Sequence, residues 1–235
     1  IQSSPEFVFK TSNLIFELSS FALLIGQFGL RSWIPLAYWL NNSRSSWVFF
    51  IEIVVTLPMV LPPTVIGFYL LLLFSPQYLL GQLWQSWFDM SLVFSFTGLV
   101  IGSVIYSLPF ALQPIQTAFR QVDENLVEGA VALGANAKQV FWTIVIPVSR
   151  YGILSGAILS FAHTLGEFGV VLMLGGSIPE ETRVASIALY DEVQKLNYPV
   201  AHQFALLLLV LSALMISVIL ILQRLSNHKQ RIRLL

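Results

Sequence analysis

The chain has 235 residues, of which 56% are hydrophobic and 10% are charged, and its mean hydropathy is +0.79. Because water-soluble domains carry about 25% charged residues, this composition excludes a soluble globule and indicates an integral membrane protein. The formal net charge is zero and there is no cysteine, which excludes disulfides, thiolate metal sites and a cysteine nucleophile.

Five stretches contain the roughly 20 mainly apolar residues that a helix needs to cross the hydrocarbon core. They are residues 14–40, 47–74, 91–119, 141–174 and 202–223. None alternates with the period of two that barrel strands need, so we expect a single all-α membrane domain over residues 1–235 with about five transmembrane helices. The first stretch contains Glu17, Arg31 and Pro35. Charges at mid-membrane are costly unless they are paired or face protein, so this stretch can also form two shorter pieces, which would give six helices.

The second stretch is interrupted by Pro58, Pro62 and Pro63. Proline removes a backbone donor and kinks a helix, and irregular backbone at membrane depth is tolerated where it is buried in protein or lines a cavity. These prolines predict either a bend for packing or a constriction that faces the substrate.

Basic residues near the ends of the stretches predict the orientation, because cytoplasmic loops carry an excess of Lys and Arg. Eight fall on one side of a five-span arrangement and three on the other. The eight are Arg44, Arg120, Lys138, Arg150, Arg224, Lys229, Arg231 and Arg233, and the three are Lys10, Arg183 and Lys195. We therefore expect the loop around Glu128 and the C-terminus to be cytoplasmic, and the N-terminus and the aromatic loop 75–90 to be outside.

The cytoplasmic loop, at about residues 120–141, carries the signals of a short helix. Asp123 is a good N-cap, and Gly134 suits the left-handed position just past the C-terminus. Asn136 can cap a second helix that enters the membrane, with Pro147 bending its start. An amphipathic connector lying on the bilayer is the alternative, but the polar face has few cations, and Gly129 beside Ala130 offers a small surface suited to a protein groove.

The fourth stretch holds His163 and Glu167, which a continuous helix places on one face. A carboxyl in hydrocarbon must be protonated, paired or wet, so Glu167 is a candidate for structural hydrogen bonding or for a pathway or gate. The pair supplies too few ligands for a metal site, and we predict none. Glycines in the same stretch favour close helix packing, although some could line a pore; they are Gly152, Gly156, Gly166 and Gly169.

No glycine-rich phosphate loop followed by Lys-Ser/Thr occurs in the chain, so any nucleotide chemistry must come from elsewhere. Here the cytoplasmic loop resembles the signature of bacterial ABC importer permeases: Glu-Ala-Ala, three residues, Gly, nine residues, then Ile-x-Leu-Pro. The matching positions are Glu128, Gly129, Ala130, Gly134, Ile144 and Pro147, and the chain departs from the pattern at Gly129 and Ile146.

Within that superfamily the chain resembles the molybdate and sulfate permease branch, particularly the molybdate type. The resemblance rests on residues 57–64, 161–169 and 178–183. It departs at His163, which is often Arg in relatives, and at Arg31, since the first span of relatives usually lacks an internal Arg.

The resemblance implies a type I ABC importer permease fold in the bacterial inner membrane. It implies a homodimer surrounded by lipid, two ATPase subunits that use ATP and Mg, and an extracytoplasmic oxyanion-binding protein. The chain would be neither an enzyme nor a cofactor carrier, and it would bind no nucleic acid. Its ATPase-coupling residues would be Glu128, Gly129, Ala130, Leu133, Gly134, Ile144 and Pro147. Its translocation path or gate would include Pro62, Pro63, His163, Glu167 and Gly169.

Molybdate is the cargo that this resemblance favours, and sulfate, thiosulfate and tungstate are the alternatives. Of the intramembrane residues only Arg31 is a fixed cation, which suits an importer whose external binding protein selects the oxyanion. A hypothesis from another class is a membrane-embedded enzyme that uses His163 and Glu167.

Overall fold

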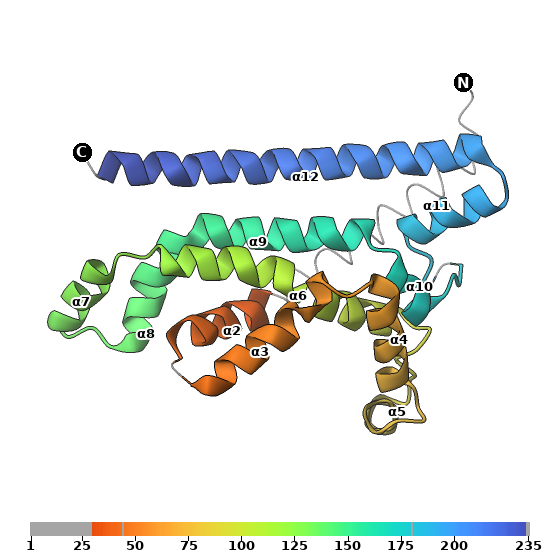
Figure 1. Cartoon of the computed structure of the whole chain (residues 1–235), viewed down its shortest axis with the longest axis horizontal. Coiled ribbons are helices and arrows are strands. Elements are labelled where there is room, and N and C mark those ends of the chain that lie inside the picture. The colour runs from red at the N-terminus through yellow and green to blue at the C-terminus, as the bar shows by residue number, and fades with distance from the viewer. Residues whose placement is uncertain (1–29, 44, 180, 234–235) are drawn as a thin grey trace.

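The computed structural model describes residues 30–43, 45–179 and 181–233, and this part of the chain contains helices and no strands. The all-α prediction is confirmed. Three helical rods in it are long and apolar enough to cross a membrane: α6 (Phe96–Arg120), the rod Ala137–Gly166, and the membrane-length part of α12 (Tyr198–Arg233). They run side by side in Figure 1.

The second predicted span is bent sharply. α3 (Ser46–Thr56) continues into a 3₁₀ turn, η2 (Leu57–Met59), and α4 (Pro63–Phe74) leaves at 116° to it. The bend falls where the prolines prevent a continuous hydrogen-bond ladder. If the bent pair is one span, the described residues contain four, compatible with the five predicted. The first predicted stretch lies partly outside the described residues, and α2 (Leu30–Asn42) is the part that the structure describes.

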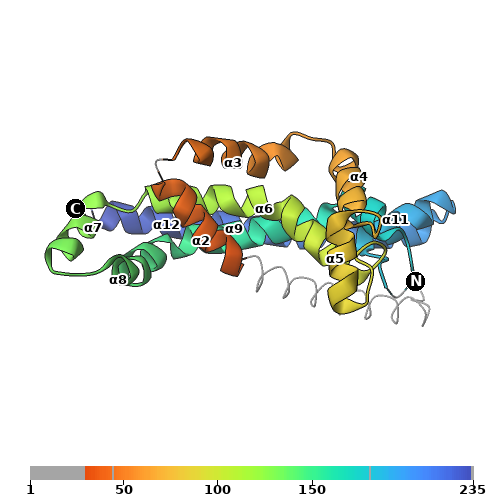
Figure 2. The ribbon, with the colours of Figure 1, turned by 90° about the horizontal axis from the view of Figure 1, so that it is seen from below.

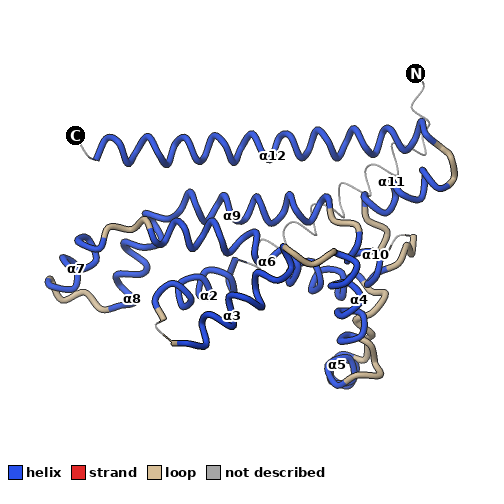
Figure 3. The backbone as a smooth tube through the Cα atoms, in the orientation of Figure 1, coloured by secondary structure: helices blue, strands red, loops and turns tan. Residues whose placement is uncertain are grey.

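The fourth predicted span ends earlier than expected. The rod consists of α8 (Ala137–Val140), a π-helical segment η3 (Phe141–Val145) and α9 (Ile146–Gly166). Extended backbone at Glu167 then separates α9 from a short helix, α10 (Gly169–Gly175). Figure 3 shows this interruption and the one before α4 as loops between helices.

Glycines set the central helix pair, α6 and α9. A Cβ added at Gly152 would lie 2.3 Å from the Ala118 Cβ, and one added at Gly156 would lie 2.7 Å from the Ala111 carbonyl oxygen. The predicted packing role is therefore confirmed at these two positions. Small residues let helices approach closely where lipid provides no hydrophobic drive for association.

The remaining elements surround this pair. In Figures 1 and 2, α12 lies on one side of it, and α2 and α3 lie on the other. One end of the molecule holds α7 (Glu124–Ala132), α8, the turn between α2 and α3, and the C-terminal end of α12; the opposite end holds α4, α5 (Leu79–Phe88), α10 and α11 (Ala185–Gln194). Loops that the basic residues predict to be cytoplasmic thus share one end, although which end faces the cytoplasm stays a prediction.

Candidate functional site

The predicted loop helix exists as α7, and its start is capped as the sequence indicates. The Asp123 carboxylate accepts a hydrogen bond from the backbone N–H of Asn125 at 2.9 Å, and Glu124 lies in the first turn, where the helix dipole favours an acid.

The end of α7 is closed by Gly134. Its φ of +85° is a left-handed conformation that glycine adopts without strain. The Gly134 N–H donates to the Val131 carbonyl at 2.9 Å, and the Ala135 N–H donates to the Ala130 carbonyl at 3.0 Å, which is the hydrogen-bond pattern of a Schellman motif. The chain reverses direction tightly here, so α7 projects from the end of the molecule (Figure 1).

No residue of α7 is buried. Its apolar side chains Leu126 and Val131 are exposed, and Leu133 just after it is 91% exposed. Nothing lies within 4 Å of a Cβ added at Gly129, so this glycine makes no close contact inside the chain. A helix with this much exposed apolar surface and an open glycine is suited to contact with another surface.

A second cap begins the rod that leads away from α7. The Asn136 side chain accepts from the Gln139 N–H, and the Gln139 side chain accepts from the Asn136 N–H, both at 2.9 Å. This capping box fixes where α8 starts. Pro147 lies in the first turn of α9, directly after the π-helical segment that contains Ile144. Proline has no backbone N–H to donate to the preceding turn. The wider π-helical turn before Pro147 accommodates this missing hydrogen bond, so the rod continues through Pro147 without a break.

At the opposite end of α9 the structure brings two predicted path residues together. A Cβ added at Gly169 would lie 2.7 Å from the Pro63 Cβ and 3.0 Å from the Thr64 nitrogen. The start of α10 therefore packs directly on the start of α4, immediately after Pro62. The two helix interruptions, at residues 60–62 and 167–168, meet at one joint.

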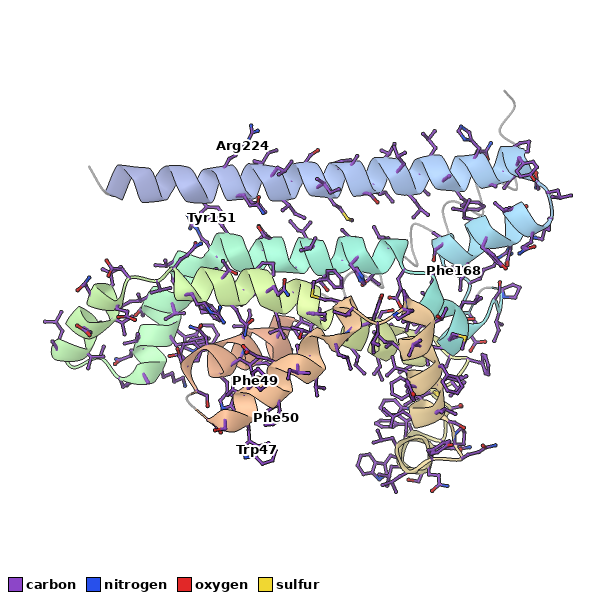
Figure 4. The ribbon with its side chains drawn as sticks, in the orientation of Figure 1. Trp47, Phe49, Phe50, Tyr151, Phe168 and Arg224 are labelled. Atoms are coloured by element: carbon purple, nitrogen blue, oxygen red, sulfur yellow. The ribbon has the colours of Figure 1, made fainter. Side chains whose placement is uncertain are left out.

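Glu167 lies in this joint and is 5% exposed. Its carboxyl is next to Ser103 of α6, yet neither oxygen completes a hydrogen bond with a described residue. The backbone carbonyl of Glu167 accepts from the Ser186 hydroxyl at 2.6 Å, which ties the break to α11. Phe168, labelled in Figure 4, packs on Tyr190 of α11 with the two ring centroids 4.8 Å apart.

His163 and Glu167 both lie on the side of α9 that faces α6, because the ring of His163 is 4.9 Å from the ring of Tyr106 and the Glu167 carboxyl is close to the same residue. His163 is stacked on Phe110 of α6 with ring centroids 3.7 Å apart, and its Nδ1 has no hydrogen-bond partner among the described residues. No hydrogen bond joins it to Glu167. Nor do three His, Cys, Asp or Glu side chains gather as possible metal ligands anywhere in the described ranges.

Comparison with known proteins identifies the family of this chain. Residues 12–232 match the family described as the inner membrane component of binding-protein-dependent transport systems. The chain belongs to this family.

Named relatives of this permease chain are transport permeases as well. It is 49% identical over 171 residues to the molybdenum transport system permease protein ModB of Azotobacter vinelandii, covering 73% of this chain and 76% of the relative. It is 35% identical over 181 residues to ModB of Escherichia coli K12, covering 77% and 78%. The sulfate transport system permease protein CysT of the same strain is 31% identical over 201 residues, covering 85% and 71%.

Solved ABC transporters share the fold. A chain of the MetNI methionine transporter, in an inward-facing form, superposes with a TM-score of 0.72 at 14% identity, over 96% of this permease and 98% of that chain. A bacterial alginate transporter in complex with its pentasaccharide-bound periplasmic protein gives 0.69 at 19% identity, over 96% and 80%.

One polar cluster of the permease was missed by the sequence reasoning. Glu52 lies in α3, inside the second predicted span, and its carboxylate accepts from Gln116 Nε2 at 3.3 Å and lies 4.0 Å from the Arg120 guanidinium. Arg120 also donates to Asn41 at 3.1 Å. The sequence did contain a signal for this cluster, because an acidic residue inside an apolar stretch indicates a position that faces protein or water.

Proposed function

We propose that this chain is the permease subunit of an ATP-driven oxyanion importer, with molybdate as its cargo. The observation that supports molybdate as the cargo is the 49% sequence identity to a molybdenum permease, compared with 31% to a sulfate permease. Sulfate, thiosulfate and tungstate remain the competing cargoes.

Two copies of the chain would enclose the path, and two ATPase subunits would bind ATP and Mg and hydrolyse the nucleotide. An extracytoplasmic binding protein would deliver the oxyanion. The chain itself would supply the path and the mechanical coupling, without catalysis. The end of the molecule that holds α7 and the C-terminus of α12 would face the cytoplasm; the N-terminus, predicted outside, lies beyond the described residues.

Coupling would take place at α7. Its exposed side chains and the open surface at Gly129 fit a helix that inserts into a groove of the ATPase, together with Glu128, Ala130 and Leu133. Closure of the ATPase dimer would push α7, and the rod beginning at the Asn136 cap would transmit that movement to the membrane through Ile144 and Pro147.

The path or its gate would involve the joint where Pro62 and Pro63 meet Gly169. Two features support this proposal: the irregular backbone before α4 and after α9, and the buried carboxyl of Glu167. Irregular backbone and carboxyl groups are both energetically costly in hydrocarbon. They occur in membrane proteins where they line a cavity or take part in a movement. His163, one turn before this joint and stacked on Phe110 of α6, would belong to the same path region.

Substitution of Gly129 tests the coupling role. Gly129→Trp adds bulk where nothing lies within 4 Å, so we expect the permease to stay folded while ATPase co-purification and uptake fall at least about tenfold, as for loss of an interface hot spot. Gly129→Ala, which matches the usual family residue, is the control and should keep both. Undiminished association of the Trp variant would remove α7 as the docking element.

A further inference from the structure

A polar face in the membrane has no role in the function described so far. α6 is long and apolar enough to span the bilayer, yet it carries polar residues at helical spacing on one face: Gln113, Gln116, Thr117 and Arg120. Gln113 and Thr117 are exposed. Polar side chains of a span rarely face lipid, because the hydrocarbon offers them no partner. This face of α6 must therefore meet water or protein.

The same face lines a groove of about 800 Å³ between α6 and α9. At one end are Met59 and Phe110, beside the proline bend; at the other are Thr143 and Pro147, in the segment that leads to α7. Because a water molecule takes about 30 Å³ of the liquid, the groove has room for a tetrahedral oxyanion with a shell of water. It thus extends from beside the proline bend to the coupling end of the molecule.

The α6 wall of the groove offers neutral hydrogen-bond donors, and its α9 wall includes one fixed cation, Arg150, which donates to the Tyr151 hydroxyl at 3.1 Å. Gln113 donates to Met59 Sδ at 3.2 Å and has a second amide N–H, and the Thr117 hydroxyl, which donates to the Gln113 carbonyl at 2.8 Å, can rotate toward an anion. Conduction requires contacts that are favourable but weak enough for release. The amide and hydroxyl donors of α6 meet this requirement.

A neighbouring hollow of about 430 Å³ shares Gln113 and Thr117 with the groove and includes Glu52 and Arg120. The Glu52 carboxylate lies 4.0 Å from the Arg120 guanidinium, so it offsets the positive charge that α6 itself carries beside Thr117. Without Glu52, the uncompensated Arg120 would hold a passing anion more tightly.

We propose that the Gln113–Thr117 face of α6 lines the inner section of the oxyanion path, and that Glu52 keeps Arg120 from trapping the anion there. This proposal rests on the proposed function, and it names the residues that contact the cargo between the proline bend and the coupling end.

Cysteine labelling tests the lining, since the natural chain has no cysteine. Single variants Gln113→Cys and Thr117→Cys, in the complete transporter in proteoliposomes, are treated with an anionic, membrane-impermeant methanethiosulfonate supplied on the side of the membrane that holds α7. Leu209→Cys and Leu214→Cys, at exposed apolar positions of α12, are matched controls. We expect the α6 thiols to react at least about tenfold faster than the α12 thiols, because a thiol must ionise in water to react, and we expect uptake to stop after modification.

Equal, slow reaction at both helices would overturn the proposal, as would full uptake after complete modification of the α6 thiols. If the unmodified transporter takes up no oxyanion, the proposed function fails instead, and the reaction rates still decide whether the face is aqueous.

Substitution of Glu52 tests the charge balance. We expect Glu52→Gln to lower the maximal uptake rate about tenfold through the uncompensated charge on Arg120. The double variant Glu52→Gln with Arg120→Gln should recover to within about twofold, because it removes both charges. A double variant as slow as the single one would show that Glu52 acts only through structure and would overturn its proposed role.

Discussion

At the scale of single residues, two glycines on either side of the break between α9 and α10 have opposite surroundings. Gly169 is in contact with Pro63 and Thr64, whereas nothing lies within 4 Å of a Cβ added at Gly166. Sequence reasoning placed both in one helix, where glycines favour packing or line a pore, and named Gly169 as a path residue. Only the structure separates them, because the helix ends between them and α4 arrives from another part of the chain.

This difference predicts a pair of outcomes. Gly169→Leu should lower the free energy of unfolding by about 1–3 kcal/mol, because the added side chain must displace backbone at the start of α4. Gly166→Ala, at an open position, should change it by less than about 0.5 kcal/mol. Thermal unfolding in detergent and uptake measure both. Equal stability of the two variants would contradict the contact between α4 and α10.

At the scale of elements, the loop around α7 is determined mostly by local signals. Asp123, Gly134 and Asn136 act within a few residues of themselves, and each adopts the cap or turn that its type favours. For this reason the short helix could be predicted with its boundaries almost correct. The bend before α4 also follows from local proline chemistry, although its angle of 116° does not.

The Asn136 cap predicts a local effect on the rod. Asn136→Ala removes an acceptor and should cost about 1 kcal/mol at the start of α8. Hydrogen exchange of the backbone N–H groups of residues 137–140 should then be about fivefold faster, while exchange in α6 stays unchanged. Asn136→Asp keeps the acceptor and is the control. Unchanged exchange in the Ala variant would mean that packing, and not the cap, fixes this helix start.

At the scale of the whole molecule, the exposed surface fits an assembly within a membrane. Trp47, Phe49 and Phe50 of α3 are exposed, and Figure 4 shows Trp47 and Phe50 pointing away from the central helix pair. α12 exposes apolar side chains between residues 206 and 221, while Figure 4 shows Tyr151 between α9 and α12. Lipid or neighbouring protein is the surrounding that such apolar surfaces need.

The identity of the cargo also belongs to this scale, because it is set by the assembled transporter. We expect uptake of labelled molybdate to be inhibited strongly by unlabelled molybdate and tungstate, and at least about tenfold less effectively by sulfate, which is smaller and would be rejected by the binding protein. Competition in proteoliposomes that contain all subunits measures this. Stronger inhibition by sulfate would assign the permease to sulfate import instead.

The sequence by itself determined the membrane class, the positions of most helices and the short capped helix α7, because composition, apolar run length and caps act locally. It could not determine where the fourth span ends, since that break is stabilised by contacts with α4, α6 and α11. Nor could it place Glu52 beside Arg120, because residues 68 positions apart meet only through the packing of α3 on α6. Tertiary structure decided these features, as each depends on groups that are distant in the chain.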